Sequence, residues 1–388
     1  MRKNNSIVVI LGNDHTNSLG VAQSVGKCDY YVVAAVWGRK TGFLAASKYV
    51  KEIITGVDPQ ACISNIIKRF SHDKGPIPII ACCDSAAVAL EDNRARLTSK
   101  FIFEYTTKQY SLRQLTTKKL QVELAEQCGF NVPQSIKIGS IVELPDKLDF
   151  EPPYIIKALV SMEGSKNDLV VCRSYEDLRE QAKTVLQRTP RILVQQYIER
   201  DYEISILGCG TCNSGCIAPA IEYKLTLYPK NVGLECLAYV DKLEEESEMK
   251  QCINRLIAKI GYVGLFSIEM MHCKKDGKYY FTEINLRNDG ANSFILKYGI
   301  NLPEAHIRDL FGIEQNLNHE SHPGYYIWEM HHFLSLIHRE ISLSQWLREI
   351  WKAKGFLTYC TEDTKPFYVQ FFNLIKAKLR IQKTTQYE

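Results

Sequence analysis

Residues 261–290, GYVGLFSIEMMHCKKDGKYYFTEINLRNDG, contain two apolar runs on either side of a Lys-Asp-Gly-Lys turn, a pattern typical of a β-hairpin. Because side chains alternate along a strand, Glu283, Asn285 and Arg287 of the second run fall on one face. Glu269 interrupts the apolar first run. It shares the face of Glu283 if the hairpin has an odd-numbered loop or a bulge, whereas a two-residue turn puts it on the opposite face.

Two carboxylates and an amide oxygen on one face form an oxygen-only ligand set. Such a set suits Mg2+ that bridges phosphate oxygens, so the sequence predicts Glu269, Glu283 and Asn285 as metal ligands. Arg287 beside them would neutralise further negative charge. A solvated strand face with ordinary surface charges is the alternative, but the apolar neighbours of Glu269 argue against it.

The size and composition of the chain indicate a globular protein. Its 388 residues suffice for two or three domains, and its formal charge of +4 is too small to indicate a nucleic-acid partner. No apolar run reaches the length of a membrane span, and the first apolar run, residues 6–11, is typical of a buried strand rather than a signal peptide. The 13 scattered cysteines suit a reducing cytoplasm.

Residues 1–112 predict an open α/β domain. Strands at 6–11, 29–37 and 76–83 alternate with helices, and the helix that follows the third strand is expected to begin at an Asp84 cap. His15 lies in the loop after the first strand, where such sheets bind ligands, so we weigh a substrate contact and a structural role evenly.

Residues 113–312 carry further candidate ligand-binding positions. Lys157 follows apolar residues in a short buried strand, where a lysine either reaches solvent or faces an anion. Ser165 lies in a polar turn with backbone donors that could wrap a phosphate. The segment CGTCNSGC, residues 209–216, resembles a metal motif in its spacing, but its position between two strands favours a hairpin tip.

The order of these features resembles the ATP-grasp superfamily over roughly residues 113–312, and within it the branch of carboxylate–amine (amino-acid) ligases. The resemblance implies a two-lobed ATP-grasp fold after the α/β domain, with ATP between the lobes. The positions that match nucleotide-binding residues of the family are Lys118, Lys157, Ser165, Gln195, Gln196, Ile198 and Glu203. The family's metal-binding Glu and its Glu-x-Asn-x-Arg strand match Glu269, Glu283, Asn285 and Arg287.

The resemblance also implies a reaction. ATP with two Mg2+ ions would phosphorylate a substrate carboxylate, an amine would attack the acyl phosphate, and Arg287 would serve as the catalytic residue. The substrates would be a small carboxylate and a small amine, either of which could be linked to a lipid or sugar. The alternatives are a carboxylating or carbamoyl-phosphate-type enzyme and a catalytically silent nucleotide-binding protein.

Residues 313–388 predict a helical C-terminal extension. Residues 365–383 combine aromatic and basic side chains without any acid. A helix of this kind can lie on an anionic membrane, which would place a cytoplasmic protein at the inner face of the membrane, but a helix docked on the protein is favoured. His331 and His332 could bind a metal or act as a base, but packed or partly exposed structural histidines are favoured. A homodimer is left open.

Overall fold

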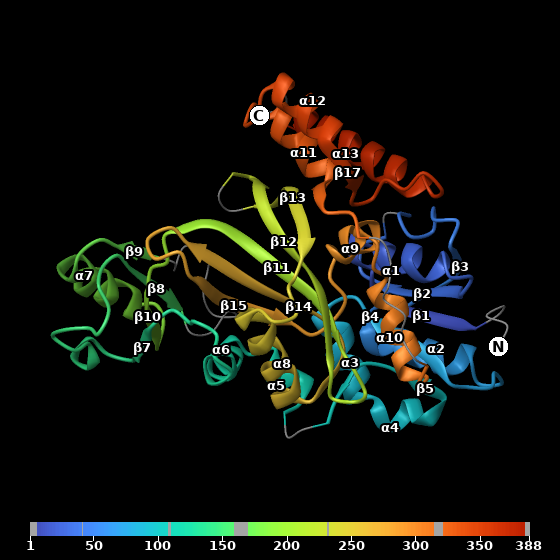
Figure 1. Cartoon of the computed structure of the whole chain (residues 1–388), viewed down its shortest axis with the longest axis horizontal. Helices are drawn as coiled ribbons and strands as arrows, with labels where there is room; N and C mark the ends of the chain where they lie inside the picture. Colours follow the sequence, from blue (N-terminus) through green and yellow to red (C-terminus); the bar gives the residue numbers. More distant parts are fainter. Residues whose placement is uncertain are drawn as a thin grey trace. The chain divides into compact units, whose positions relative to one another are not determined.

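The computed structural model describes residues 6–40, 42–107, 110–158, 170–230, 233–313 and 321–384, without the side chains of 377–384. The chain forms two compact units. The large unit comprises Met1–Cys128, Glu203–Glu269 and Glu283–Glu388, and the small unit comprises Gly129–Tyr202 and Met270–Thr282. Helices and strands are both abundant, which confirms the predicted mixed α/β fold (Figure 1). The predicted domain limits after residues 112 and 312 remain predictions.

A five-stranded parallel sheet forms the N-terminal part of the large unit, in the order β3-β2-β1-β4-β5. Its strands are β1 (Ile7–Asn13), β2 (Tyr31–Trp37), β3 (Val50–Thr55), β4 (Ile77–Ala81) and β5 (Phe101–Ile102). The helical segments that accompany it are α1 (Thr16–Gly26), α2 (Pro59–Arg69), α3 (Asp84–Asp92), α4 (Arg94–Leu97) and the 3-10 turn η1 (Thr98–Lys100). The central strands are almost wholly apolar because helices cover both faces of a parallel sheet.

Two details of this sheet differ from the sequence-based expectation. Strand β3 (Val50–Thr55) was not predicted, because it lies at the sheet edge, where its charged residues remain exposed and weaken the apolar pattern. The predicted Asp84 cap is wrong. Cys83 occupies the cap position of α3, and Asp84 is the first helical residue, so its carboxylate is available for another partner.

A second sheet, most of whose residues belong to the large unit, has eight strands, in the order β15-β14-β11-β12-β13-β16-β17 with β6 beside β14. Their bounds are β6 (Tyr105–Thr106), β11 (Arg200–Gly210), β12 (Cys216–Tyr228), β13 (Leu234–Lys242), β14 (Tyr262–Cys273), β15 (Tyr279–Asn285), β16 (Gly324–Ile327) and β17 (Ala353–Phe356). Helices α5 (Leu112–Leu115), α6 (Lys118–Gln127), α8 (Glu248–Ile260), α9 (Asn292–Tyr298) and α10 (Leu302–Leu310) complete this part. A shared apolar core joins strands of both sheets with α1 and α9.

The small unit is built on a four-stranded antiparallel sheet, in the order β7-β10-β8-β9. Its elements are β7 (Ser135–Ile138), the 3-10 turn η2 (Ile141–Glu143), β8 (Tyr154–Ala158), β9 (Val170–Cys172), α7 (Tyr175–Leu186) and β10 (Ile192–Gln196). An apolar cluster between the sheet and α7 forms a core of its own.

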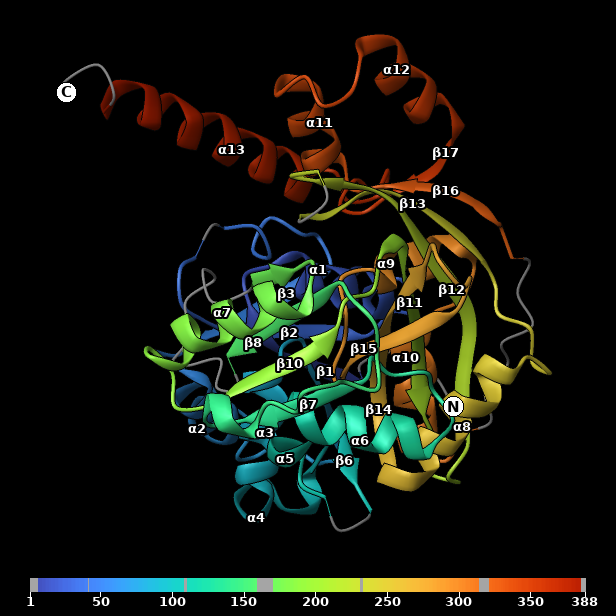
Figure 2. The same cartoon turned by 90° about the vertical axis from the view of Figure 1, so that its left-hand side faces the viewer.

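The C-terminal part adds three helices and two strands to the large unit. The helices are α11 (Glu329–Ile337), α12 (Leu343–Lys352) and α13 (Lys365–Thr384), and they lie beyond β16 and the edge strand β17 (Figure 2). The segment before α13 is fixed by the buried Asp363. Its carboxylate accepts hydrogen bonds from Gln23, from the Ser47 hydroxyl at 2.6 Å and from the Lys48 backbone at 2.8 Å.

Candidate active site

The hairpin β14–β15 places the predicted metal ligands on one sheet face. Its turn closes where the Cys273 N–H donates to the Lys278 carbonyl, so an uninterrupted ladder would put Glu269 opposite Thr282 and on the other face from Glu283. However, the Asn285 amide lies 3.4 Å from the Ser267 hydroxyl. Repulsion from Glu283 also contributes to the raised pKa of Glu269, so the two carboxylates lie near each other, as the predicted shared face requires.

Each of the two carboxylates already lies beside a lysine. Glu269 Oε2 is 3.2 Å from Lys224 Nζ of β12, and Glu283 Oε2 is 3.0 Å from Lys118 Nζ at the start of α6. Lys118, the predicted phosphate ligand, is largely exposed, whereas Lys224 is nearly buried. Each carboxylate is held by one ion pair of the large unit while remaining partly accessible.

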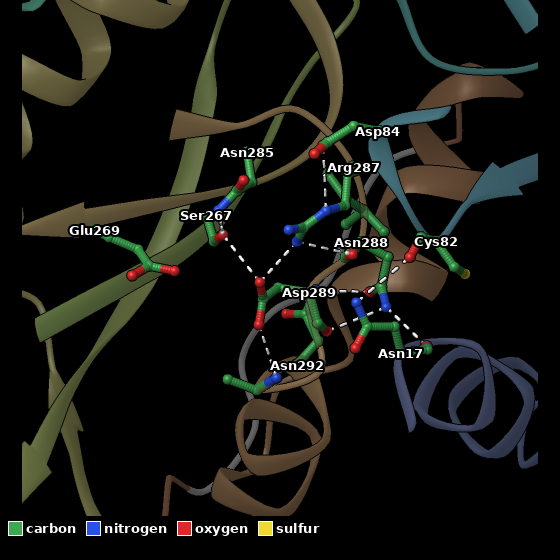
Figure 3. A network of polar contacts seen from close by, with 12 residues as sticks. Asn17, Cys82, Asp84, Ser267, Glu269, Asn285, Arg287, Asn288, Asp289 and Asn292 are labelled. Carbon is green, nitrogen blue, oxygen red and sulfur yellow. Dashed lines mark hydrogen bonds and ion pairs between the residues drawn. The ribbon is translucent and has the colours of Figure 1, made fainter. Parts of the chain in front are cut away.

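Arg287 is the centre of a polar network (Figure 3). Its guanidinium donates to Asp289 at 2.7 Å and to the backbone carbonyl of Asn288 at 3.2 Å, and its Nε lies 3.5 Å from the Asp84 carboxylate. The Ser267 hydroxyl donates to Asp289 at 3.2 Å. The network thus extends from strand β14 to the first turn of α3. There Asp84, which was expected to cap the helix, contacts Arg287.

The network holds its charges in place. Burial alone would raise the pKa of Asp289, but the Arg287 guanidinium and the Ala291 N–H hold that pKa below its usual value. Burial works against the charged form of Arg287, yet Asp289 and Asp84 raise its pKa. Asp289 is therefore an anion and Arg287 a cation at neutral pH.

A second set of charges surrounds Lys224 on the same sheet. Burial disfavours the ammonium of Lys224, but Glu269, Glu235 and Glu222 outweigh that effect and raise its pKa. Glu222 is fully buried on the strand of Lys224, and burial followed by repulsion from Glu235 raises its pKa well above the usual value. Neither carboxylate oxygen of Glu222 has a hydrogen-bond partner among the described residues. Five carboxyl groups surround the two cations Lys224 and Arg287, namely those of Glu269, Glu235, Glu222, Asp289 and Asp84.

This excess of acid fits a cation. In each of Glu269 and Glu283, one carboxylate oxygen contacts a lysine and the other is outside that ion pair. Burial raises the pKa of Glu269, and the nearby Lys224 offsets this only in part. Within the described ranges, no three His, Cys, Asp or Glu side chains are grouped closely enough to bind a metal by themselves. Two carboxylates and the amide oxygen of Asn285 would therefore share Mg2+ with oxygens of a bound phosphate.

The predicted nucleotide residues divide between the two units. In the small unit, Lys157 Nζ donates to Gln195 Oε1 at 2.8 Å across the neighbouring strands β8 and β10. Gln196 exchanges hydrogen bonds with the backbone of Gln134, and Ile198 packs in an apolar cluster. In the large unit, Glu203 of β11 lies opposite Lys224 of β12 in the backbone register of the two strands. Ser165 lies outside the described residues.

A pocket of about 140 Å³ lies beside the hairpin in the large unit. Lys118, Glu283, Asn285 and Asp84 line it together with apolar residues such as Leu112. A wider opening of about 410 Å³ shares Asp84 with this pocket. The linings of the two pockets also share Val88 and Thr116.

The other candidates have different environments. The His15 side chain is exposed, and its Nδ1 accepts the Asn17 N–H at the start of α1. Neighbouring residues still remove part of the water around the imidazole, which lowers its pKa. His332 is buried, and its Nε2 lies 2.6 Å from the Glu349 carboxylate. This packed position is the one expected for a structural histidine. His331 lies against the Trp328 ring. The cysteine segment forms the β11–β12 hairpin tip, as predicted.

The sequence-based reasoning missed Lys224, Glu222, Asp289 and Asp84. A signal existed for the first two, because EYK on β12 repeats the alternation of charged residues that identified the second hairpin strand. Asp84 could not be found in this way, since its contact with Arg287 joins residues about two hundred positions apart.

Comparison with known proteins agrees with this arrangement. A sequence profile of the ATP-grasp domain matches residues 123–294. The chain is 25% identical over 330 residues to a D-aspartate ligase of Enterococcus faecium (strain Aus0004), covering 76% of this chain and 74% of that protein.

Solved structures give the same fold. N5-carboxyaminoimidazole synthetase from Staphylococcus aureus, complexed with ADP, superposes with a TM-score of 0.61 at 17% identity over 82% of this chain and 81% of that one. An L-amino acid ligase from Bacillus licheniformis gives a TM-score of 0.53 at 16% identity over 80% and 75% of the two chains. With its hairpin of acidic residues, its fold and its relatives in agreement, this chain contains an ATP-grasp domain over residues 123–294 and is similar to ATP-dependent ligases.

Proposed function

We propose that this protein joins a carboxylate to an amine at the expense of ATP, through an acyl phosphate, and releases ADP and phosphate. The observation that carries the proposal is the face of the β14–β15 hairpin, where Glu269, Glu283 and Asn285 lie together and Arg287 follows on the same chain. Its relatives include a D-aspartate ligase and an L-amino acid ligase, so an amino acid is the proposed class for one of the two substrates.

Glu269, Glu283 and Asn285 would hold two Mg2+ ions. When bound, these ions would neutralise and align the phosphate oxygens of ATP, which is most of what phosphoryl transfer requires. The 3.2 Å ion pair with Lys224 favours the charged form of Glu269 and orients its carboxylate. Lys118, now paired with Glu283 and highly exposed, is able to turn toward a phosphate, and Lys157 with Gln195 is proposed to contact the nucleotide in the small unit.

The proposed reaction has two steps. A substrate carboxylate oxygen attacks the γ-phosphorus, and the bond from that phosphorus to the bridging oxygen of ADP breaks. The neutral amine then attacks the acyl carbon, the bond from carbon to the phosphate oxygen breaks, and the amine loses a proton to solvent. Arg287 donates to the oxygens that gain negative charge in both steps, and Asp84 and Asp289 fix its guanidinium for that task.

The test measures ADP release by the purified protein with Mg-ATP and pools of D- and L-amino acids, small carboxylates and amines. ADP that requires both an acid and an amine supports the proposal, and hydroxylamine in place of the amine should trap the acyl phosphate as a hydroxamate. Release of AMP would instead indicate an adenylate, and ADP released with bicarbonate alone would replace the proposal by a carboxylating enzyme. Glu123→Gln, at an exposed ion pair with Lys119, is the matched control for Glu283→Gln.

The remaining partner and location proposals concern how the substrates reach the protein. A lipid- or sugar-linked acceptor, a homodimer and a position at the inner face of the membrane are compatible with the proposed chemistry. Among the residues that the structure describes, no helix is both long enough and apolar enough to span a bilayer.

A further inference from the structure

Helix α12 exposes an apolar stripe to solvent. Leu343, Leu347 and Trp351 follow one another at intervals of four residues and therefore lie on one side of the helix, where they are 58%, 53% and 85% exposed. No residue of α12 is buried. The tryptophan is one of only four in the chain, and leaving so large an apolar side chain in water is unfavourable unless the surface has a partner.

Helix α13 has two apolar sides, of which one is covered. Phe367, Phe371 and Leu374 pack on the core of the large unit. Tyr368 and Phe372 each follow one residue after a covered phenylalanine and are 49% and 55% exposed. Ile375, one turn after Phe372, is also exposed and lies on the same side of the helix. The covered side and the Asp363 anchor hold the helix in place, so the exposed side is presented by a fixed element.

The exposed side of α13 is bordered by positive charge. Lys365 lies three residues before Tyr368 and Lys376 lies four residues after Phe372, which makes each a neighbour of the exposed aromatic residues. The helix contains no Asp or Glu, and its basic residues are Lys365, Lys376, Lys378, Arg380 and Lys383. The combination is that of a helix that lies in the interface of an anionic membrane.

We propose that the exposed residues of α12 and α13, namely Leu343, Leu347, Trp351, Tyr368, Phe372 and Ile375, form a surface that binds anionic lipid membranes. Both helices lie at the same end of the large unit, beyond β16 and β17 (Figures 1 and 2). Charge complementarity selects this occupant over a second copy of the chain. A second copy would bring the same uncompensated lysines to the contact, whereas acidic headgroups neutralise them.

The proposal goes beyond the ligase reaction and is tested without measuring activity. The full-length protein is sedimented with vesicles of phosphatidylcholine containing phosphatidylglycerol and with vesicles of phosphatidylcholine alone. Binding is expected to the anionic vesicles, to weaken with added salt, and to shift the fluorescence of Trp351 to shorter wavelength. The triple variant Leu343→Ser, Leu347→Ser, Trp351→Ser and the double variant Lys365→Glu, Lys376→Glu should each lower the partition coefficient about tenfold or more.

The matched control removes apolar residues that are equally exposed elsewhere. Val57 and Val142 are 86% and 90% exposed, and the variant Val57→Ser, Val142→Ser should bind vesicles like the wild type. All substituted side chains are exposed, so each variant should retain the wild-type circular dichroism spectrum. Failure of the intact protein to bind anionic vesicles overturns the proposal, as does unchanged binding by the triple variant. A dimer that the triple variant dissociates, without vesicle binding, would make this surface a contact between copies.

Discussion

Replacing Lys224 by methionine should destabilise the large unit in a manner that depends on pH. The substitution retains most of the apolar volume but removes the cation from among Glu269, Glu222 and Glu235. At 3.2 Å and an effective dielectric constant near 20, the pair with Glu269 is worth about 5 kcal/mol of Coulomb energy. Desolvation of the lysine offsets part of this, and loss of one partner of a buried pair costs about 3–5 kcal/mol in total.

The pH dependence follows from the carboxylates left behind. Without the ammonium, burial and mutual repulsion keep their folded-state pKa values above those of the unfolded chain. Such groups are neutral and cost little below the unfolded-state pKa, whereas the full penalty applies above the folded-state pKa. The loss of stability relative to the wild type should therefore grow as the pH rises from below the unfolded-state pKa of a glutamate, about 4.3, toward neutral pH.

Urea unfolding followed by tryptophan fluorescence measures this effect, since all four tryptophans belong to the large unit. Adding Glu269→Gln to Lys224→Met should restore part of the lost stability, because the second substitution removes an unpaired charge. A deficit that is equal at acidic and at neutral pH, together with a double variant no more stable than the single one, would refute the reasoning.

Three further outcomes are expected. Glu283→Gln should lower ADP formation by at least about a hundredfold with an unchanged circular dichroism spectrum, while Glu123→Gln should leave turnover within about twofold; equal turnover in both would remove the metal assignment. Arg287→Ala should lower kcat by about a hundredfold or more with little change in ATP binding measured by calorimetry, because its hydrogen bonds strengthen in the transition state; a loss confined to ATP affinity would contradict this role. His332→Ala should lower the melting temperature by several degrees because it leaves the Glu349 carboxylate without its buried partner, yet kcat should persist in the folded fraction; an active-site role would instead reduce kcat at full stability.

The sequence allowed the site residues to be predicted where their arrangement depends on neighbouring positions in the chain, and not where it depends on distant segments. Glu269, Glu283 and Asn285 were assigned to one hairpin because alternation along a strand is a local rule. Whether Glu269 and Glu283 share a face was left open, since a one-residue shift within the ladder decides it and no local pattern marks that shift.

Contacts between distant segments were beyond the sequence pattern. Lys224 meets Glu269 because β11 lies between their strands in the sheet, and the order of strands in a sheet is not written in any single strand. Asp84 was expected to cap its helix, a role that short polar residues often take there, but the tertiary contact with Arg287 accompanies a different cap.

The anchor at Asp363 bears on how the protein is made and dissected. Gln23, Ser47 and Lys48 are synthesised long before the carboxylate that accepts their hydrogen bonds, so these hydrogen bonds cannot form until residue 363 has left the ribosome. Expressing residues 113–312 alone would also remove the whole five-stranded sheet and the strands β6, β16 and β17 of the eight-stranded sheet. Fusion partners and truncations should accordingly be placed outside the segment that ends with this aspartate.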